Sequence, residues 1–193
     1  DLLFVTNGFP LFPYLLYNWP IGWQFEQDFE RQRRFLAALP EAARGALLLR
    51  LYPLERGWNA RERVESGLPP MRHDPGRPAA DALSRARLVV LDHVGTSFTE
   101  ALAHGTPTIA FRDPAVSPFR PQTAPLAAKL KEAGLLYDTP EEAAKAAARL
   151  MRDVSSWWEG AAARGAREAW LASHGRAGNW PKPWAEFLSG LIR

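Results

Sequence analysis

Five short apolar runs, separated by segments with helical periodicity, limit the folds that this chain can adopt. The runs occupy residues 2–6, 46–53, 87–92, 107–111 and 135–138. Strands that are apolar along their whole length are typical of parallel sheets, which carry helices on both faces. The alternation of strand and helix therefore predicts an α/β fold, a three-layer Rossmann-like domain with a mostly parallel sheet flanked by helices.

The segments between and after these runs have the periodicity or the end signals of helices. We expect helices over residues 25–39, 79–86, 97–104, 122–134, 139–154, 155–174 and 185–193. The helix after residue 138 has the clearest start, with Thr139 as its cap and Pro140 in its first position. We expect one Rossmann-like domain over residues 1–153. A C-terminal helical extension over residues 154–193 should pack on it or on a domain outside this chain.

Two aromatic segments need a separate reading. Residues 9–23 contain three prolines, which exclude a regular helix because proline removes an N–H donor and clashes with the preceding turn. We expect a long loop there, either a wall beside an acceptor or a hydrophobic lid. Neighbouring Trp157 and Trp158 cannot share one side of a helix. At least one is expected to pack against something outside this chain, and packing within the domain is the alternative.

Composition and motifs argue against several classes of function. The chain has no cysteine, and its four histidines form no HxxxH pair, so we expect no metal site. The net charge is only +3, and the basic residues are interleaved with acids, which argues against a nucleic-acid groove. A GxGxxG turn and a Walker loop are both missing from the sequence, so we expect neither a dinucleotide cofactor nor a P-loop enzyme.

The ends of the sequence suggest a longer polypeptide. The chain opens with Asp1 and an apolar run, without Met or a targeting segment, and it closes with a long aromatic tail. We expect the C-terminal portion of a larger protein, with a further domain before it. No apolar run reaches the ~18 residues of a membrane span, and we expect a cytoplasmic location.

The stretch "LDHVGTSFTEALAHGTPTIAF", residues 91–111, carries the main functional signal. In a parallel α/β sheet, ligands bind at the carboxyl ends of the strands, and here a strand ends at a small-residue turn. Gly95 allows close backbone approach, and Thr96 and Ser97 offer hydroxyls and N–H groups at a helix N-terminus, which suits a phosphate. Glu100 lies one turn further, where a carboxylate can accept hydrogen bonds from ribose hydroxyls. The alternative is a capping box, in which Ser97 and Glu100 only bond each other's backbone N–H groups.

This region resembles a known pattern. The segment "ARLVVLDHVGTSFTEALAHGTPTIAF" is similar to the nucleotide-sugar segment in the second domain of GT-B-type glycosyltransferases, and related 2-epimerases of UDP-N-acetylglucosamine share the plan. With "LLRLYP" and "DVSSWWE", it resembles a family of transferases from bacterial surface-carbohydrate gene clusters, first noted in spirochaetes. The likeness runs from Leu2 to about Trp170.

The resemblance implies roles for residues at the strand ends. Gly95, Thr96 and Ser97 would hold the phosphates of the donor, and Glu100 would bind its ribose. Arg50, after the second strand, would sit beside the phosphates, although an arginine there can also pair with an acid.

Three further residues are implied as contacts of the cleft. Asn7 and Gly8 would line the cleft between domains, or form only a turn. His93 departs from the small residue of many relatives, and it would touch the sugar or merely replace that residue. Asp92 is expected to orient a loop by accepting N–H bonds. His104 is expected only to favour the C-terminal end of its helix.

These likenesses imply glycosyl transfer from a sugar-nucleotide donor to a glycan acceptor during assembly of a surface polysaccharide, without a bound metal or other cofactor. The chain would be the donor-binding half, and no general base within it is evident from the sequence. A sugar-nucleotide epimerase of the same architecture and a non-catalytic interaction module that uses the Trp-rich tail are the alternatives.

Overall fold

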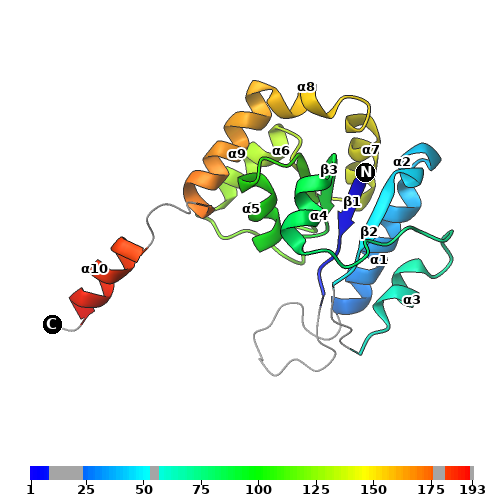
Figure 1. Ribbon diagram of the computed structural model, residues 1–193, viewed down its shortest axis with the longest axis horizontal. Helices are drawn as coiled ribbons and strands as arrows, with labels where there is room; N and C mark the ends of the chain where they lie inside the picture. The colour runs from blue at the N-terminus through cyan, green and yellow to red at the C-terminus, as the bar shows by residue number, and fades with distance from the viewer. Residues whose placement is uncertain (9–23, 53–56, 176–180, 192–193) are drawn as a thin grey trace.

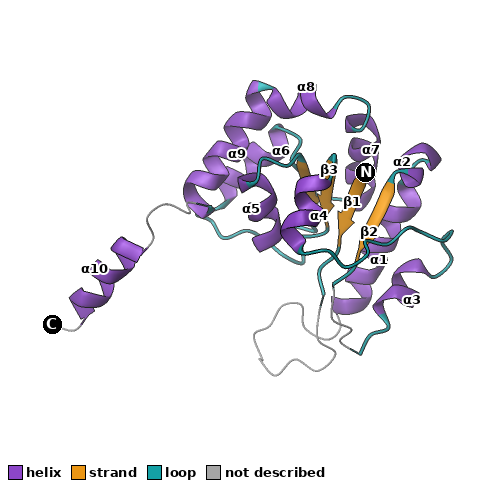
Figure 2. Cartoon of the chain, viewed as in Figure 1, coloured by secondary structure: helices purple, strands orange, loops and turns teal. Residues whose placement is uncertain are grey.

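A computed structural model describes residues 1–8, 24–52, 57–175 and 181–191. Its centre is a five-stranded parallel sheet with the strand order β2-β1-β3-β4-β5 (Figure 2). The strands are β1 (Leu2–Val5), β2 (Leu47–Arg50), β3 (Leu88–Leu91), β4 (Thr108–Phe111) and β5 (Leu136–Tyr137). All five predicted runs form strands, and the predicted parallel sheet is confirmed.

Helices cover the sheet and extend beyond it. They are α1 (Gln24–Ala38), α2 (Glu41–Gly45), α3 (Ala60–Glu65), α4 (Ala79–Arg85), α5 (Thr96–Ala103), α6 (Ala124–Glu132), α7 (Pro140–Leu150), α8 (Val154–Glu159), α9 (Ala161–His174) and α10 (Pro181–Leu191). The helix predicted over residues 155–174 is split, because Gly160 has an extended backbone that ends α8 and begins α9. The aromatic loop predicted over residues 9–23 lies outside the described residues.

Alternation of side chains along the strands builds two apolar layers. Leu2 and Phe4 of β1 face a core cluster with α1 and α7, whereas Leu3 faces a second cluster with α5, α6 and α9. Figure 1 shows α1, α2, α3 and α7 on one side of the sheet and α4, α5, α6 and α9 on the other. The predicted three-layer α/β architecture is therefore confirmed.

The strand register fixes where a ligand can bind. Because all strands are parallel, their carboxyl ends meet at one edge, which faces the lower part of Figure 1. The segments after β1, β3 and β4 leave the sheet at this edge. Residues far apart in the sequence are brought together there.

The two neighbouring tryptophans pack within this chain. Trp158 is 4% exposed and donates its indole N–H to the carbonyl of Gly105 at 3.0 Å. Trp157 is half-buried and donates to the carbonyl of Ala133 at 3.0 Å. The expectation that one of them packs outside the chain is wrong, because α8 lies across both core clusters.

Helix α10 differs from the others. All of its described residues are exposed, including the large apolar side chains Trp184, Phe187, Leu188 and Leu191. Figure 1 shows it extending away from the sheet and its helices. The boundary expected at residue 153 stays a prediction, because Val154 of α8 belongs to the core next to the sheet whereas α10 buries nothing.

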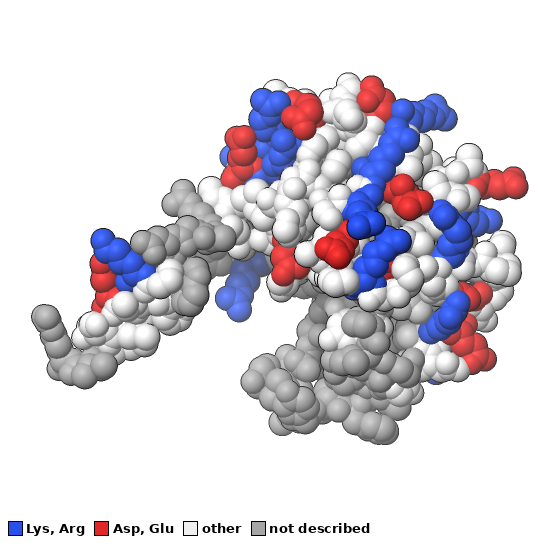
Figure 3. All heavy atoms as spheres, in the orientation of Figure 1, with Lys and Arg blue, Asp and Glu red and all other residues white. Residues whose placement is uncertain are grey.

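The surface has no extended region of one charge in the view of Figure 3, where acidic and basic side chains alternate over the helices. In the part of the chain that the structure describes, every helix is too short or too polar to cross a membrane.

Replacing Trp158 tests whether α8 belongs to the core. Trp158→Ala removes a buried indole and leaves a cavity, so the free energy of unfolding should fall by about 3–5 kcal/mol. The matched variant Trp184→Ala removes a ring that is 56% exposed, and it should change stability by less than about 0.5 kcal/mol. Urea unfolding followed by circular dichroism measures both; equal effects would contradict the packing described.

Candidate functional site

A buried carboxylate joins the carboxyl ends of β1 and β3. Asp92, which is 8% exposed, accepts hydrogen bonds from the backbone N–H of Asn7, at 2.9 and 3.1 Å to its two oxygens. The side-chain amide of Gln32, on α1, donates to the same carboxylate at 2.7 Å. Asp92 thus holds the loop after β1 by N–H bonds, which confirms the role predicted for it.

His93 continues this network toward α5. Its Nδ1 lies 2.7 Å from Oδ1 of Asp92. A Cβ atom on Gly95 would lie 2.9 Å from Cδ2 and 3.1 Å from Nε2 of His93, so the imidazole packs directly against the backbone of Gly95. The close approach expected at Gly95 is therefore made, in this structure, by the neighbouring imidazole.

Asn7 and Gly8 form a tight turn at the end of β1. The side-chain oxygen of Asn7 accepts from the N–H of Gly8 at 3.0 Å. A Cβ atom at Gly8 would come within 2.2 Å of the Tyr52 side chain, so only glycine fits here. The turn is thus explained by packing, and a contact with a ligand in an interdomain cleft stays a prediction for both residues.

The first turn of α5 has no side-chain cap. The helix begins at Thr96, with Gly95 as its N-cap, and no side chain accepts from its first N–H groups. The predicted capping box is wrong because Ser97 lies inside the helix, one position past its first residue, rather than before it. The N–H groups of this turn and the positive end of the helix dipole stay available to an anion.

A cavity of about 530 Å³ opens beside this turn. It is bounded by the segment after β3, by α5, by the segment between β4 and α6, and by the end of α9. The residues that matter most here are Gly95, Thr96, Glu100, Arg112, Arg120 and Trp170. The structure thus brings three of the predicted site residues together with two arginines, in a space large enough for a nucleotide.

Arg112 is the most unusual charge in this cavity. It follows β4 directly and is 8% exposed. Its guanidinium donates to the hydroxyl of Ser117 at 2.8 Å and lies 3.6 Å from the centre of the Phe119 ring. Burial lowers the pKa of Arg112, yet no salt bridge to it is formed within the described residues. A buried cation without an acidic partner is suited to an anionic ligand.

Arg50 lies apart from this cavity. Its guanidinium pairs with the carboxylate of Asp74, whose side chain is 1% exposed. Asp74 is held there because its own segment bonds to β2, with the Asp74 N–H donating to the carbonyl of Leu49 at 2.9 Å. Arg50 thus takes the alternative of pairing with an acid, and its contact with phosphate stays a prediction.

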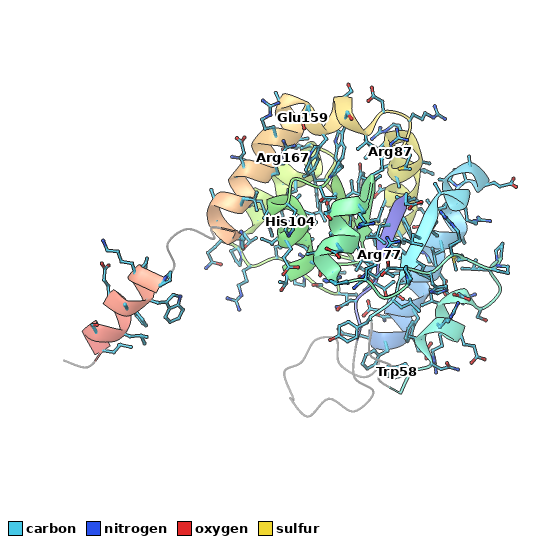
Figure 4. The ribbon with its side chains drawn as sticks, in the orientation of Figure 1. Trp58, Arg77, Arg87, His104, Glu159 and Arg167 are labelled. Carbon is cyan, nitrogen blue, oxygen red and sulfur yellow. The ribbon has the colours of Figure 1, made fainter. Side chains whose placement is uncertain are left out.

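The far wall of the cavity is aromatic. The indole N–H of Trp170, on α9, donates to the hydroxyl of Thr99 at 3.1 Å, and the ring stacks on His174 at 4.2 Å. His104 is exposed and follows α5 at the end opposite Thr96, outside this cavity (Figure 4). Its position agrees with the role predicted for it at the helix C-terminus.

A second cavity, of about 590 Å³, lies between α1 and α3 beside Trp58 (Figure 4). Its charges include Glu26 and Arg63, which form an ion pair at 2.6 Å, and Arg63 also lies over the Trp58 ring. These charges neutralise each other, so this cavity is less suited to a phosphate than the one beside α5.

Sequence reasoning missed Arg112, Phe119 and Arg120. The signal was present for Arg112, because it follows the apolar run of β4 just as Asp92 follows that of β3. Residues in these positions share one edge of a parallel sheet. The contributions of Phe119 and Arg120 depend on the fold of the segment before α6, and no local pattern indicates it.

Two hydroxyl variants test the start of α5. Thr139 caps α7 by accepting from the N–H of Glu142 at 3.2 Å, so Thr139→Ala should lower the free energy of unfolding by about 1 kcal/mol. Ser97→Ala should change it by less than about 0.5 kcal/mol, because Ser97 caps nothing. Thermal or urea unfolding of both variants gives the comparison. A loss at Ser97 as large as that at Thr139 would restore the capping box.

Comparison with known proteins identifies the family. The crystal structure of CalG4, described as the calicheamicin glycosyltransferase, is similar to this chain with a TM-score of 0.49 and 19% sequence identity. That similarity covers 98% of this chain, which spans 41% of the CalG4 chain. No curated protein matches the chain. Residues 1–188 match the sequence model of the LIC12162 family transferase. This match extends over nearly the whole sequence, and the chain therefore belongs to the LIC12162 family of transferases.

Proposed function

We propose that this chain is the donor-binding part of a glycosyltransferase and that its ligand is a sugar nucleotide. The observation that carries the proposal is the buried guanidinium of Arg112, which has no salt bridge within the described residues and lines the same cavity as the first turn of α5. Membership of a transferase family supports group transfer, and the cavity supports a negatively charged donor.

The phosphates of the donor bind at the first turn of α5. The N–H groups of Thr96 and Ser97 are free of side-chain caps, and Gly95 brings the backbone close to the cavity. Arg112 and Arg120 approach from the segment after β4 and supply two positive charges. Arginine suits this role because its planar donors match phosphate oxygens in pairs.

The nucleoside extends from the phosphates along α5. Glu100 is exposed and lies one turn beyond Thr96, on the same cavity. Its carboxylate can accept hydrogen bonds from both hydroxyls of a ribose. The rings of Phe119 and Trp170 provide apolar surface nearby, which suits the flat faces of a base or a sugar.

The same charges assist transfer. As the bond between the sugar and the diphosphate breaks, its electron pair moves onto a phosphate oxygen. Arginine side chains and helix N–H groups that already face this oxygen stabilise the charge without reorganising. We propose that the acceptor is a glycan of a surface polysaccharide and that a further domain, outside this chain, completes the cleft.

Helix α10 supports a role in contacts with another domain or protein. Its apolar side chains Trp184, Phe187 and Leu191 are between 56% and 66% exposed. This surface keeps open the alternative that the chain also acts as an interaction module. The epimerase alternative gains no specific support.

Two variants separate the phosphate contact from the ribose contact. Arg120→Ala should weaken UDP, GDP or CMP and also inorganic diphosphate by about 10-fold or more, because a hydrogen bond to a charged group contributes about 1.5–3 kcal/mol. Glu100→Ala should weaken the nucleotide by a similar factor and leave diphosphate unchanged. Isothermal titration calorimetry measures each dissociation constant.

A matched control removes the same charge elsewhere. Arg85 is exposed on α4, before β3, so Arg85→Ala should leave nucleotide binding within about 2-fold. Absence of binding by the unmodified chain to any of the three nucleotides would overturn the proposed function.

A further inference from the structure

We infer that His93 is the general base of this chain and that Asp92 is the residue that positions it. The inference rests on the proposed function, because it assigns a base to that same transfer. It also goes beyond the proposed function, which gives this chain only the binding of the donor.

The contacts of Asp92 determine where the proton of His93 lies. Three of its hydrogen bonds come from groups that can only donate, the N–H of Asn7 to both oxygens and the side-chain amide of Gln32. A carboxylate in this setting accepts from every neighbour, so Nδ1 of His93, at 2.7 Å, carries a proton and donates it. The neutral imidazole then has its lone pair on Nε2.

Nε2 lies at the cavity beside α5. It is 3.1 Å from the position that a Cβ atom on Gly95 would take, and Gly95 lines that cavity. Within the described residues no hydrogen bond to Nε2 is formed, and the His93 side chain is 18% exposed. The free nitrogen is therefore next to the helix turn that we assign to the phosphates of the donor.

This arrangement has the order of groups that proton abstraction requires. A carboxylate orients the imidazole through Nδ1, and Nε2 faces the reacting groups. In the proposed step, Nε2 takes the proton of an acceptor hydroxyl while the hydroxyl oxygen bonds to the anomeric carbon. The bond between that carbon and the diphosphate oxygen breaks, and its electrons leave with the diphosphate. The imidazolium that forms is stabilised by Asp92.

Other charges near His93 also affect its titration. Arg31, on α1, interacts electrostatically with Asp92 and forms an ion pair with Asp28. Glu100 on α5 and Arg112 after β4 line the cavity that Gly95 borders. The test therefore compares whole pH profiles between variants rather than a single pH.

The first experiment reads the tautomer without any turnover. Long-range ¹H–¹⁵N spectra of the 193-residue chain, above the pH where His93 is protonated, should show the proton on Nδ1 of His93. Asp92→Asn should move the proton to Nε2, because the amide can donate to Nδ1. A proton on Nε2 in the unmodified chain would overturn the inference.

The second experiment measures release of nucleoside diphosphate from sugar nucleotides with water as the acceptor. His93→Gln should lower the rate by about 10²–10⁴-fold and leave the dissociation constant of the donor within about 2-fold. The rate of the unmodified chain should rise with pH as the imidazole loses its proton, and this rise should be missing from the variant. The control His104→Gln, outside the cavity, should behave like the unmodified chain.

The outcomes separate this inference from the function on which it rests. A chain that binds sugar nucleotides but releases product no faster than His93→Gln overturns the role of His93 alone. A chain that binds none of them overturns the proposed function and the inference together. Thermal unfolding of each variant shows whether it is folded, and a variant that only loses stability, with an unchanged pH profile, also contradicts the inference.

Discussion

The guanidinium of Arg112 is the charge around which the site is organised. It is nearly buried, bonded to Ser117 and placed on the face of Phe119, and within the described residues no acid pairs with it. Keeping a cation out of water costs free energy unless an anion compensates for it. The parallel register brings Arg112 to the edge where β3 leads into α5, so one ligand can meet both the guanidinium and the N–H groups of Thr96 and Ser97.

Much of the fold could be predicted because its signals are local. The apolar runs give the strands directly, and Thr139 with Pro140 marks the start of α7 within four residues. Asp92 could be assigned to a loop-orienting role because a carboxylate that directly follows a buried strand has few other uses.

The parts that could not be predicted depend on contacts between distant residues. Arg50 is paired with Asp74 because a segment 24 residues later returns to the edge of β2, and nothing near Arg50 indicates this. The capping box failed because α5 begins earlier than the spacing of Ser97 and Glu100 suggests. The tryptophans of α8 find partners in Gly105 and Ala133, which only the packed structure brings near.

Binding and proton transfer are linked through one network at this edge. Asp92 connects the end of β1, helix α1 and His93, and His93 in turn packs against Gly95 at the start of α5. A change at any of these positions therefore affects both the phosphate turn and the imidazole. Helix α10, with its exposed apolar face, provides the surface through which this unit can join another.

The central claim is that a nucleotide's phosphates bind between the first turn of α5 and Arg112. Mapping of ¹H–¹⁵N chemical shifts during titration with a nucleoside diphosphate tests it most directly. The account predicts the largest changes at the amides of Thr96 and Ser97 and at the Nε–H of Arg112, with little change near Trp58. Changes confined to the cavity beside Trp58, or none with any nucleoside diphosphate, would contradict it.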